Sequence, residues 1–299
     1  MTMFMVRGVI TALITPFTEN FDICVECLKE MLEFQVENGI AGIFLSGTYG
    51  EGVIMPLHSR EKLFAKAIEY APSKTMLLPH IGGVDVESIV KLAKLAKDLG
   101  YPAVSIVGPI YHAPTKKGLA KFYSYIASKT DIPIIIYNNK GRQGYNITPD
   151  DYEALTKEVP SIIGIKDTSY DVEQLLELVK RFSSSHFIAS GGDNLMYYTF
   201  AVGAHAHICG ISNVFPEIAV GIYKAVKEGD YAKALELQYK ILLVRRTIRK
   251  YNIESQEVLR AMLNIRGIKS GYPPIQLAFE FTQQQVNELK YLVETFSRP

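Results

Sequence analysis

The sequence predicts a (β/α)8 barrel with a C-terminal helical extension. Short runs rich in Val and Ile alternate eight times with longer segments that have helical periodicity. The short runs are apolar on both faces, as expected of a parallel sheet covered by helices. The eight pairs fit in about 230 residues, a usual length for such a barrel. A doubly wound open sheet with helices on both faces is the alternative.

Each predicted strand is followed by one predicted helix. The strands are Val9–Ile14, Gly42–Leu45, Met76–His80, Ala103–Val107, Pro133–Tyr137, Ile162–Ile165, Phe187–Ala189 and His205–Ile208. The helices are Ile23–Glu37, Arg60–Tyr70, Val86–Leu99, Lys117–Ser128, Pro149–Val159, Val172–Phe182, Leu195–Val202 and Pro216–Lys227. Thr148 and Pro149 supply an N-cap and a first-turn proline, and Asp171 with Gln174 resembles a capping box.

Strand signals end after Asp230. Three further helices are predicted over Tyr231–Tyr251, Ser255–Ile265 and Thr282–Phe296. We therefore expect a catalytic barrel over residues 1–230 and a helical extension over residues 231–299 that packs on it.

The composition is that of a soluble globular protein. Of 299 residues, 48% are hydrophobic and 21% charged, with a net charge of +1. The balanced charge offers no basic face for nucleic acid, and no apolar run is long enough to span a membrane. The apolar stretch Met1–Phe17 lacks a basic leading segment and a cleavage site, and so predicts a first strand instead of a signal peptide.

The three cysteines are Cys24, Cys27 and Cys209. So small and odd a number argues against a secreted disulfide framework and predicts a reducing, cytoplasmic location. Cys24 and Cys27 form one CxxC within a predicted helix, without a second pair. We interpret both as packed thiols and not as a zinc or redox site.

Reactive groups of a barrel lie where its strands end. Lys166 follows the run Ile162–Ile165, among apolar neighbours that favour a neutral, nucleophilic amine able to form a Schiff base. A structural ion pair with Asp167 is the alternative. Tyr137 ends the fifth strand and could shuttle protons, or pack as a ring with a hydrated hydroxyl.

Two further patterns are suggestive. The turn Ser46–Gly52 contains three glycines, which permit positive φ and leave backbone N–H groups to form a carboxylate cradle, although a purely structural turn is an equal alternative. It matches no nucleotide-binding loop. His205 and His207 form an HxH on a strand, which predicts both rings on one face and offers a metal-dependent aldolase as a competing hypothesis.

Four strand-end motifs together resemble the dihydrodipicolinate synthase / N-acetylneuraminate lyase family of pyruvate-dependent class I aldolases. They are Gly47-Thr48-Tyr49-Gly50-Glu51, Tyr137-Asn138 followed by Arg142, Gly164-Ile165-Lys166-Asp167-Thr168, and Ser190-Gly191-Gly192-Asp193. The resemblance extends from about Gly8 to the C-terminal helices. It implies an enzyme that needs no added cofactor or metal, and commonly a homotetramer built as a dimer of dimers.

The resemblance also implies roles for single residues. Lys166 would form the Schiff base with pyruvate, or with a 2-keto acid that yields it, and Tyr137 would act as acid and base. Thr48 would connect Tyr137 to Tyr111, which a neighbouring subunit lends. The amides of Thr48 and Tyr49 would hold the pyruvate carboxylate. The remaining pocket residues would be Gly192 and Ile208, through their backbone carbonyls, and Arg142.

Departures from the family pattern bear on the substrate. Tyr49 replaces a small hydroxyl residue, Lys140 a frequent proline, and Ile110 the first aromatic of a Tyr-Tyr pair, which weakens the dihydrodipicolinate interpretation. Arg142 favours that interpretation, because it matches an arginine that grips the second substrate's carboxylate. Gly-Ile-Lys-Asp-Thr is similar to aldolases of 2-keto-3-deoxy sugar acids. We therefore expect reversible aldol cleavage of such a sugar acid, with dihydrodipicolinate synthesis and a non-catalytic pyruvate-binding barrel as alternatives.

Overall fold

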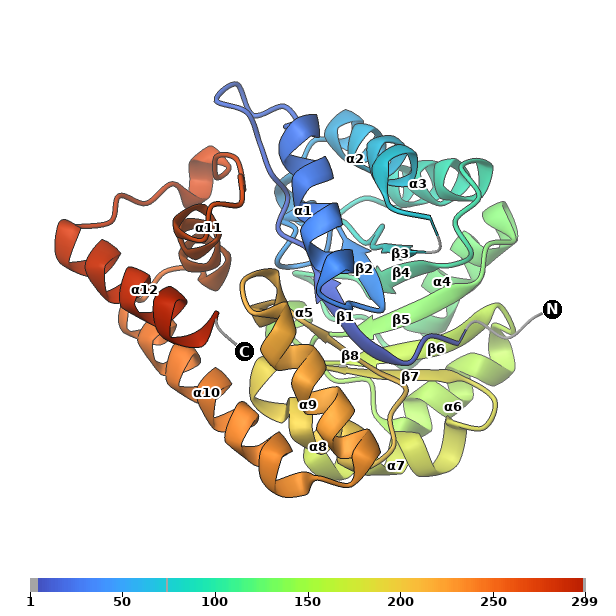
Figure 1. Ribbon diagram of the computed structural model, residues 1–299. Helices are drawn as coiled ribbons and strands as arrows, with labels where there is room; N and C mark the ends of the chain where they lie inside the picture. Colours follow the sequence, from blue (N-terminus) through green and yellow to red (C-terminus); the bar gives the residue numbers. More distant parts are fainter. Residues whose placement is uncertain (1–4, 74, 298–299) are drawn as a thin grey trace.

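The computed structural model describes residues 5–73 and 75–297, and this part of the chain forms a (β/α)8 barrel with C-terminal helices (Figure 1). The parallel strands follow the order β3-β2-β1-β8-β7-β6-β5-β4. A bridge between His80 and Ser105 joins the two ends of that order, and the Ile81 amide donates to the Ser105 carbonyl at 2.9 Å. The sheet therefore curls into a nearly closed barrel, and the open-sheet alternative is wrong.

The element bounds lie close to those predicted. The strands are β1 (Gly8–Ala12), β2 (Gly42–Leu45), β3 (Met76–Pro79), β4 (Val104–Val107), β5 (Ile134–Asn138), β6 (Ile162–Asp167), β7 (Phe187–Gly191) and β8 (Ala206–Cys209). The helices are α1 (Val25–Glu37), α2 (Leu57–Tyr70), α3 (Val86–Asp98), α4 (Lys116–Thr130), α5 (Lys140–Gln143), α6 (Pro149–Glu158), α7 (Val172–Phe182), α8 (Met196–Ala201), α9 (Pro216–Glu228), α10 (Tyr231–Lys250), α11 (Ser255–Ile265) and α12 (Gln283–Phe296). Short 3-10 turns are η1 (Gly52–Ile54), η2 (Asp193–Leu195), η3 (Ile211–Asn213) and η4 (Ile275–Leu277).

Two apolar layers hold the barrel together. Alternate strand positions fill its interior, among them Ile10, Phe44, Ile135 and Ile208, while a larger cluster lies between the sheet and the surrounding helices. Strands buried on both faces explain why the sequence runs are continuously apolar. Because side chains alternate along a strand, Tyr137 of β5 also points inward.

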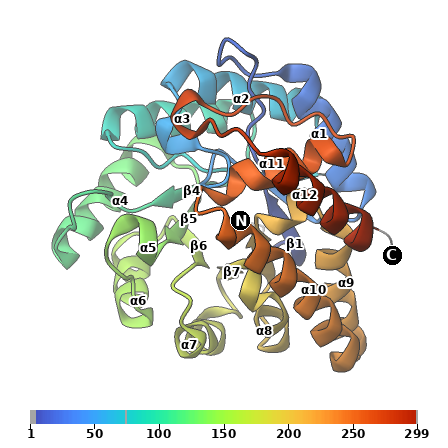
Figure 2. The same cartoon turned by 90° about the vertical axis from the view of Figure 1, so that its left-hand side faces the viewer.

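The C-terminal helices form a separate arm beside the barrel (Figures 1 and 2). α10 packs along α9, and α11 packs on α12. The division into units of residues 1–230 and 231–299 stays a prediction, and their ends, residues 1–4 and 298–299, lie outside the described residues. No described helix is both long and apolar enough to cross a bilayer.

Helix capping agrees with the sequence at α6 and differs at α7. The Thr148 hydroxyl accepts from the Asp151 amide and completes a capping box. Asp171 caps α7, but the Gln174 amide group turns away and donates to Asp167 at 2.8 Å. The expected reciprocal box at α7 is therefore wrong, because Gln174 serves the end of β6 instead.

Cys24 and Cys27 differ from the prediction of packed thiols. Cys24 is the N-cap of α1 and not an interior residue, and a disulfide joins it to Cys27. The interpretation overlooked that an N-cap and a residue in the first turn lie close enough to bond. Cys209 is a buried free thiol. The predicted cytoplasmic location stays a prediction.

Candidate active site

Lys166 lies inside the barrel at the carboxyl end of β6. It pairs in register with Tyr137 of β5 and Ala189 of β7, and only 3% of its surface is exposed. Its Nζ atom lies 3.9 Å from the centre of the Phe44 ring and 4.0 Å from that of Tyr137. Among the described residues it forms no ion pair with a carboxylate. The faces of these two electron-rich rings contact the amine.

Asp167 points away from Lys166, so the ion-pair alternative is wrong. Its carboxylate accepts from Asn138 at 2.7 Å, from Gln174 at 2.8 Å and from the Ser169 hydroxyl at 2.6 Å. Asn138 Oδ1 in turn accepts from the Gln143 side chain at 2.8 Å. This buried network fixes the ends of β5 and β6, and thereby the separation of Tyr137 and Lys166.

The environment of Lys166 favours a neutral amine. Burial disfavours the ammonium form and lowers the pKa of Lys166 from its ordinary 10.5 to about 7, although the charges of Cys209 and Asp193 act in the opposite direction. The neutral amine is therefore far more populated near neutral pH than in an exposed lysine. Such an amine can attack a carbonyl carbon without a separate base to deprotonate it first.

Tyr137 belongs to a hydroxyl and amide cluster. Its Oη atom lies 3.3 Å from Thr48 Oγ1 and accepts from Asn139 Nδ2 at 2.8 Å. Asn139 Nδ2 also lies 3.4 Å from Thr48 Oγ1. Burial raises the pKa of the Tyr137 phenol, and these hydrogen bonds lower it in part. Tyr137 therefore carries its proton at neutral pH and can pass it through an oriented hydroxyl pair.

The turn Ser46–Gly52 uses its glycines differently from the prediction. Positive φ angles occur at Ser46 (57°) and Glu51 (59°), and not at the three glycines. Gly52 is required by crowding, because a Cβ there would lie 1.9 Å from the Ser46 carbonyl oxygen. Within the described chain the Thr48 and Tyr49 amides donate no hydrogen bond, so they stay available to an anion.

Tyr49 joins a cluster that includes the C-terminal extension. Its hydroxyl accepts from Arg245 of α10 at 3.2 Å, and Arg245 Nε lies 3.5 Å from Asp193 Oδ2. Asp193 Oδ1 accepts from the amides of Gly210 and Ile211 at 3.1 and 3.3 Å. Burial raises the pKa of Tyr49, which keeps its hydroxyl protonated. The extension thus holds one wall of the site.

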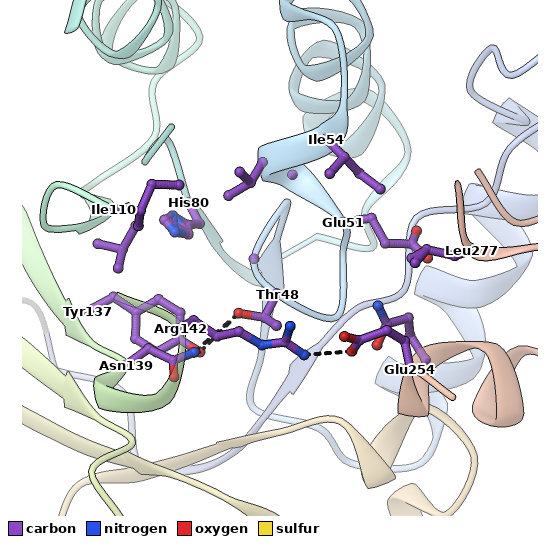
Figure 3. A pocket seen from close by; sticks show the side chains of 15 residues that line it. Thr48, Glu51, Ile54, His80, Ile110, Tyr137, Asn139, Arg142, Glu254 and Leu277 are labelled. Carbon is purple, nitrogen blue, oxygen red and sulfur yellow. Dashed lines mark hydrogen bonds and ion pairs between the residues drawn. The ribbon is translucent and has the colours of Figure 1, made fainter. Parts of the chain in front are cut away.

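Two adjoining cavities open at these strand ends. The lysine cavity, of about 260 Å³, is lined by Lys166, Gly192 and Ile208. The outer cavity, of about 270 Å³, is lined by His80, Ile110 and other residues (Figure 3). Residues shared by both cavities are Thr48, Tyr137, Asn139, Arg142, Glu254 and Gln256. The two cavities therefore share part of their lining, including Tyr137 and Thr48.

Arg142 lines both cavities, whereas Tyr111 lines neither. Figure 3 shows Arg142 extended toward Glu254, and its Nη2 atom lies 2.6 Å from Glu254 Oε2. Tyr111 is 91% exposed, has a φ of 72° and packs on His112. The structure therefore brings together Lys166, Tyr137 and Thr48, but not Tyr111.

His207 lies in β8 and His205 directly precedes that strand, and the two rings bond separate partners. The His205 ring accepts from the Ile188 amide at 3.0 Å, and His207 Nδ1 lies 2.9 Å from the Thr199 hydroxyl. The described residues contain no group of three or more His, Cys, Asp or Glu side chains suited to a metal ion. Within the described residues, His205 and His207 therefore lack the further ligands that the metal-dependent aldolase hypothesis requires.

Comparison with known proteins identifies the family. The model of the Dihydrodipicolinate synthetase family matches residues 5–295. The chain belongs to this family. The 4-hydroxy-tetrahydrodipicolinate synthase of Thermotoga maritima is 31% identical over 267 residues, which cover 88% of this chain and 90% of that protein.

Solved structures agree with the sequence comparison. Dihydrodipicolinate synthase from Aquifex aeolicus has a TM-score of 0.88 at 29% identity, covering 98% of this chain and 99% of that one. CdNal from Clostridium difficile, solved with mannosamine, has a TM-score of 0.90 at 25% identity, covering 97% and 99%. The resemblance inferred from the four motifs is confirmed, and the chain is an enzyme of the class I aldolase and lyase type.

Several site residues escaped the sequence analysis. His80 ended a predicted strand without an assigned role, and Asn139 followed the quoted Tyr137-Asn138 pair. The strand-end position was a usable signal for both. Arg245 and Glu254 come from the extension, where no local pattern marks a contribution to the barrel.

Proposed function

We propose that the protein condenses pyruvate, bound to Lys166 as a Schiff base, with aspartate semialdehyde, as a 4-hydroxy-tetrahydrodipicolinate synthase. The observation that carries the pyruvate chemistry is the buried amine of Lys166, which has a pKa of about 7 and no carboxylate partner among the described residues. A neutral amine beside a protonated Tyr137 supplies the nucleophile and the proton donor that imine formation requires.

The proposed sequence uses the cluster around Tyr137. The amine attacks the keto carbon of pyruvate while the free amides of Thr48 and Tyr49 hold the carboxylate. Tyr137, paired with Thr48 at 3.3 Å, supplies the proton that lets water leave. The Tyr137 phenolate left by that step then takes a proton from the methyl group, which restores the phenol and gives the enamine that attacks the aldehyde. Gly192 and Ile208 line the cavity where the imine forms, and their backbone carbonyls would contact it.

The choice of aldehyde rests on the relatives and on Arg142. The Thermotoga relative is named for dihydrodipicolinate synthesis, and Arg142 lines both cavities, where a second carboxylate would approach. A guanidinium binds a carboxylate through two parallel hydrogen bonds. The carboxylate of aspartate semialdehyde would displace Glu254 from Arg142.

Cleavage of a 2-keto-3-deoxy sugar acid is the second candidate. The ion pair between Arg142 and Glu254 already neutralises that cation, which favours a substrate end carrying hydroxyl groups. CdNal, similar at 25% identity, was solved with the amino sugar mannosamine. A polyol can bond both members of the pair without separating them.

The assembly proposed for this protein is a homotetramer, built as a dimer of dimers. Tyr111 is 91% exposed on the β4–α4 loop, and the outer cavity of one chain has apolar walls at Ile54, Val107 and Leu277. An aromatic ring from a neighbouring subunit can bury itself there and reach Thr48. This would complete the hydroxyl series from Tyr137 to Tyr111.

The test combines trapping with substrate screening. Incubation with pyruvate and sodium borohydride should add one reduced pyruvate to Lys166, as seen by intact mass and peptide mapping. Wild-type turnover is then compared for aspartate semialdehyde and for D-glyceraldehyde. Faster turnover of the first supports the proposal, and faster turnover of the second supports the sugar acid. An adduct without turnover of any aldehyde indicates a pyruvate-binding barrel, and no adduct contradicts the Schiff base.

A further inference from the structure

His80 places a buried imidazole in the wall of the reaction site. It follows β3, is 2% exposed and lines the outer cavity. Its ring centre lies 5.5 Å from that of Tyr137 and 5.7 Å from that of Phe44. Lys166 Nζ lies against the same two rings. Figure 3 shows His80 beside Ile110 and above Tyr137. The imidazole and the amine therefore both lie close to the same aromatic pair.

The hydrogen bonds of His80 determine which nitrogen carries its proton. The Gly82 amide donates to Nδ1 at 3.2 Å, so Nδ1 is the acceptor and Nε2 holds the hydrogen in the neutral ring. Gly82 allows this turn because a Cβ there would lie 2.5 Å from His80 Cε1. Nε2 forms no hydrogen bond with a described residue. The ring thus keeps one unused donor at the cavity.

The surroundings keep this imidazole neutral. Arg60, itself 4% exposed, donates to the His80 carbonyl and, at 2.9 Å, to the Ser46 hydroxyl. Burial, together with the charges of Arg60 and Lys166, holds the pKa of His80 well below its usual range. His80 therefore acts as a fixed donor over the working pH range, and not as a general acid that gives up and regains a proton.

We propose that His80 is a catalytic residue, whose Nε2–H donates a hydrogen bond to the carbonyl oxygen of the acceptor aldehyde during carbon–carbon bond formation. The proposal rests on the pyruvate chemistry proposed above and holds for either aldehyde. A neutral donor in a desolvated site stabilises developing negative charge on oxygen without transferring its own proton.

His80 takes part in one step of the reaction, the formation of the carbon–carbon bond. The enamine nitrogen returns its electron pair to form an iminium, and the methylene carbon bonds the aldehyde carbon. The π pair of the carbonyl moves to its oxygen, which takes a proton from Tyr137. His80 donates its hydrogen bond to that oxygen while the charge forms, and keeps its proton. Imine and enamine formation from pyruvate alone do not involve it.

Measuring imine and enamine formation separately from condensation distinguishes a catalytic role of His80 from a structural one. Borohydride trapping and deuterium exchange into the pyruvate methyl group report imine and enamine formation without an aldehyde. Condensation is measured with whichever of aspartate semialdehyde and D-glyceraldehyde the wild-type enzyme accepts. The identity of that aldehyde tests the proposed function, whereas the variant-to-wild-type ratio tests His80.

The variants are His80→Leu, which removes the donor, His80→Gln, which retains an N–H, and His58→Leu, an exposed histidine on α2 as the matched control. We expect His80→Leu to trap pyruvate and exchange deuterium within about twofold of wild type, while kcat for condensation falls about 10²-fold. His80→Gln should recover about tenfold of that loss. Wild-type condensation by His80→Leu, an equal loss in both half-reactions, or no recovery in His80→Gln would each overturn the proposal.

Discussion

Lys166 and Arg260 are both buried cations, and the chain surrounds them in opposite ways. Arg260 of α11 has a 4% exposed side chain and donates to both oxygens of Glu51, at 2.8 and 3.0 Å. Its Nε lies 3.4 Å from Glu257, and its Nη1 donates to the Ser270 carbonyl at 2.8 Å. Lys166, equally buried, has aromatic rings instead of carboxylates around it.

The difference shows how one fold produces a reactive cation and a structural one. Without carboxylate partners, desolvation lowers the pKa of Lys166 to about 7. Around Arg260 the buried groups include carboxylates: burial raises the pKa of Glu51, Arg260 lowers it, and Glu257 raises it. The cluster of Glu51, Glu257 and Arg260 ties the Ser46–Gly52 turn to the extension, so the structural cation holds the loop that serves the reactive one.

Removing the reactive cation should have the largest effect. In Lys166→Met no amine is left to form the Schiff base, so we expect turnover to fall about 10⁴-fold or more and the borohydride adduct to vanish. The fold should persist, because no carboxylate loses a partner. Mass spectrometry and steady-state kinetics measure both effects, with the exposed Lys233→Met as control. An adduct on Lys166→Met would contradict the assignment.

Removing the structural cation should destabilise the protein instead. Arg260→Met leaves the buried side chains of Glu51 and Glu257 without their cation, which costs about 3–5 kcal/mol of unfolding free energy. Urea denaturation measures this loss. Lys233→Met, which breaks an exposed pair with Glu236, should leave the midpoint unchanged. Adding Glu51→Gln to Arg260→Met should recover part of the stability, and a double variant as unstable as the sum of both changes would argue against coupling.

The sequence predicts the reactive residues of the barrel better than the charged residues of the extension. Lys166 and Tyr137 end apolar runs, and a barrel places strand ends together, so local pattern plus topology sufficed for both. Arg245 and Arg260 sit in amphipathic helices of the extension, where a charge that reaches the barrel has the same spacing as one facing water, and Glu254 is the N-cap residue of α11. Their roles depend on how the extension packs, which no short-range pattern encodes.

Backbone detail was equally beyond the sequence. Glycines in the Ser46–Gly52 turn suggested positive φ, but Ser46 and Glu51 adopt it and Gly52 instead makes room for a carbonyl. Composition indicates that a turn is tight, whereas the identity of the strained residue depends on neighbours such as Arg260, which binds Glu51 from another helix. The disulfide of Cys24 and Cys27 was missed for a related reason, since helix bounds are uncertain by about one or two residues.

Tyr137→Phe should separate proton transfer from the electrostatics of Lys166. The ring stays beneath the amine, so the pKa of Lys166 should remain near 7, while the loss of the hydroxyl slows imine and enamine formation about 10²-fold. The pH profile of borohydride trapping gives the midpoint, and deuterium exchange gives the rate. Tyr239→Phe, on the exposed face of α10, is the control. A midpoint shifted by more than one pH unit would show that the hydroxyl, and not burial, sets the amine's pKa.

Stability should depend on pH with opposite signs for the two sites. The folded state lowers the pKa of Lys166 from 10.5 to about 7, so it binds fewer protons than the unfolded state in that range, and stability rises with pH. Glu51 is raised from 4.5 to about 8, so its contribution falls as pH rises through that window. Urea denaturation from pH 5 to pH 10 should therefore show Lys166→Met removing a rise above pH 7, and Glu51→Gln removing a decline below pH 8. If both variants changed the profile in the same direction, the two buried charges would not differ as their partners imply.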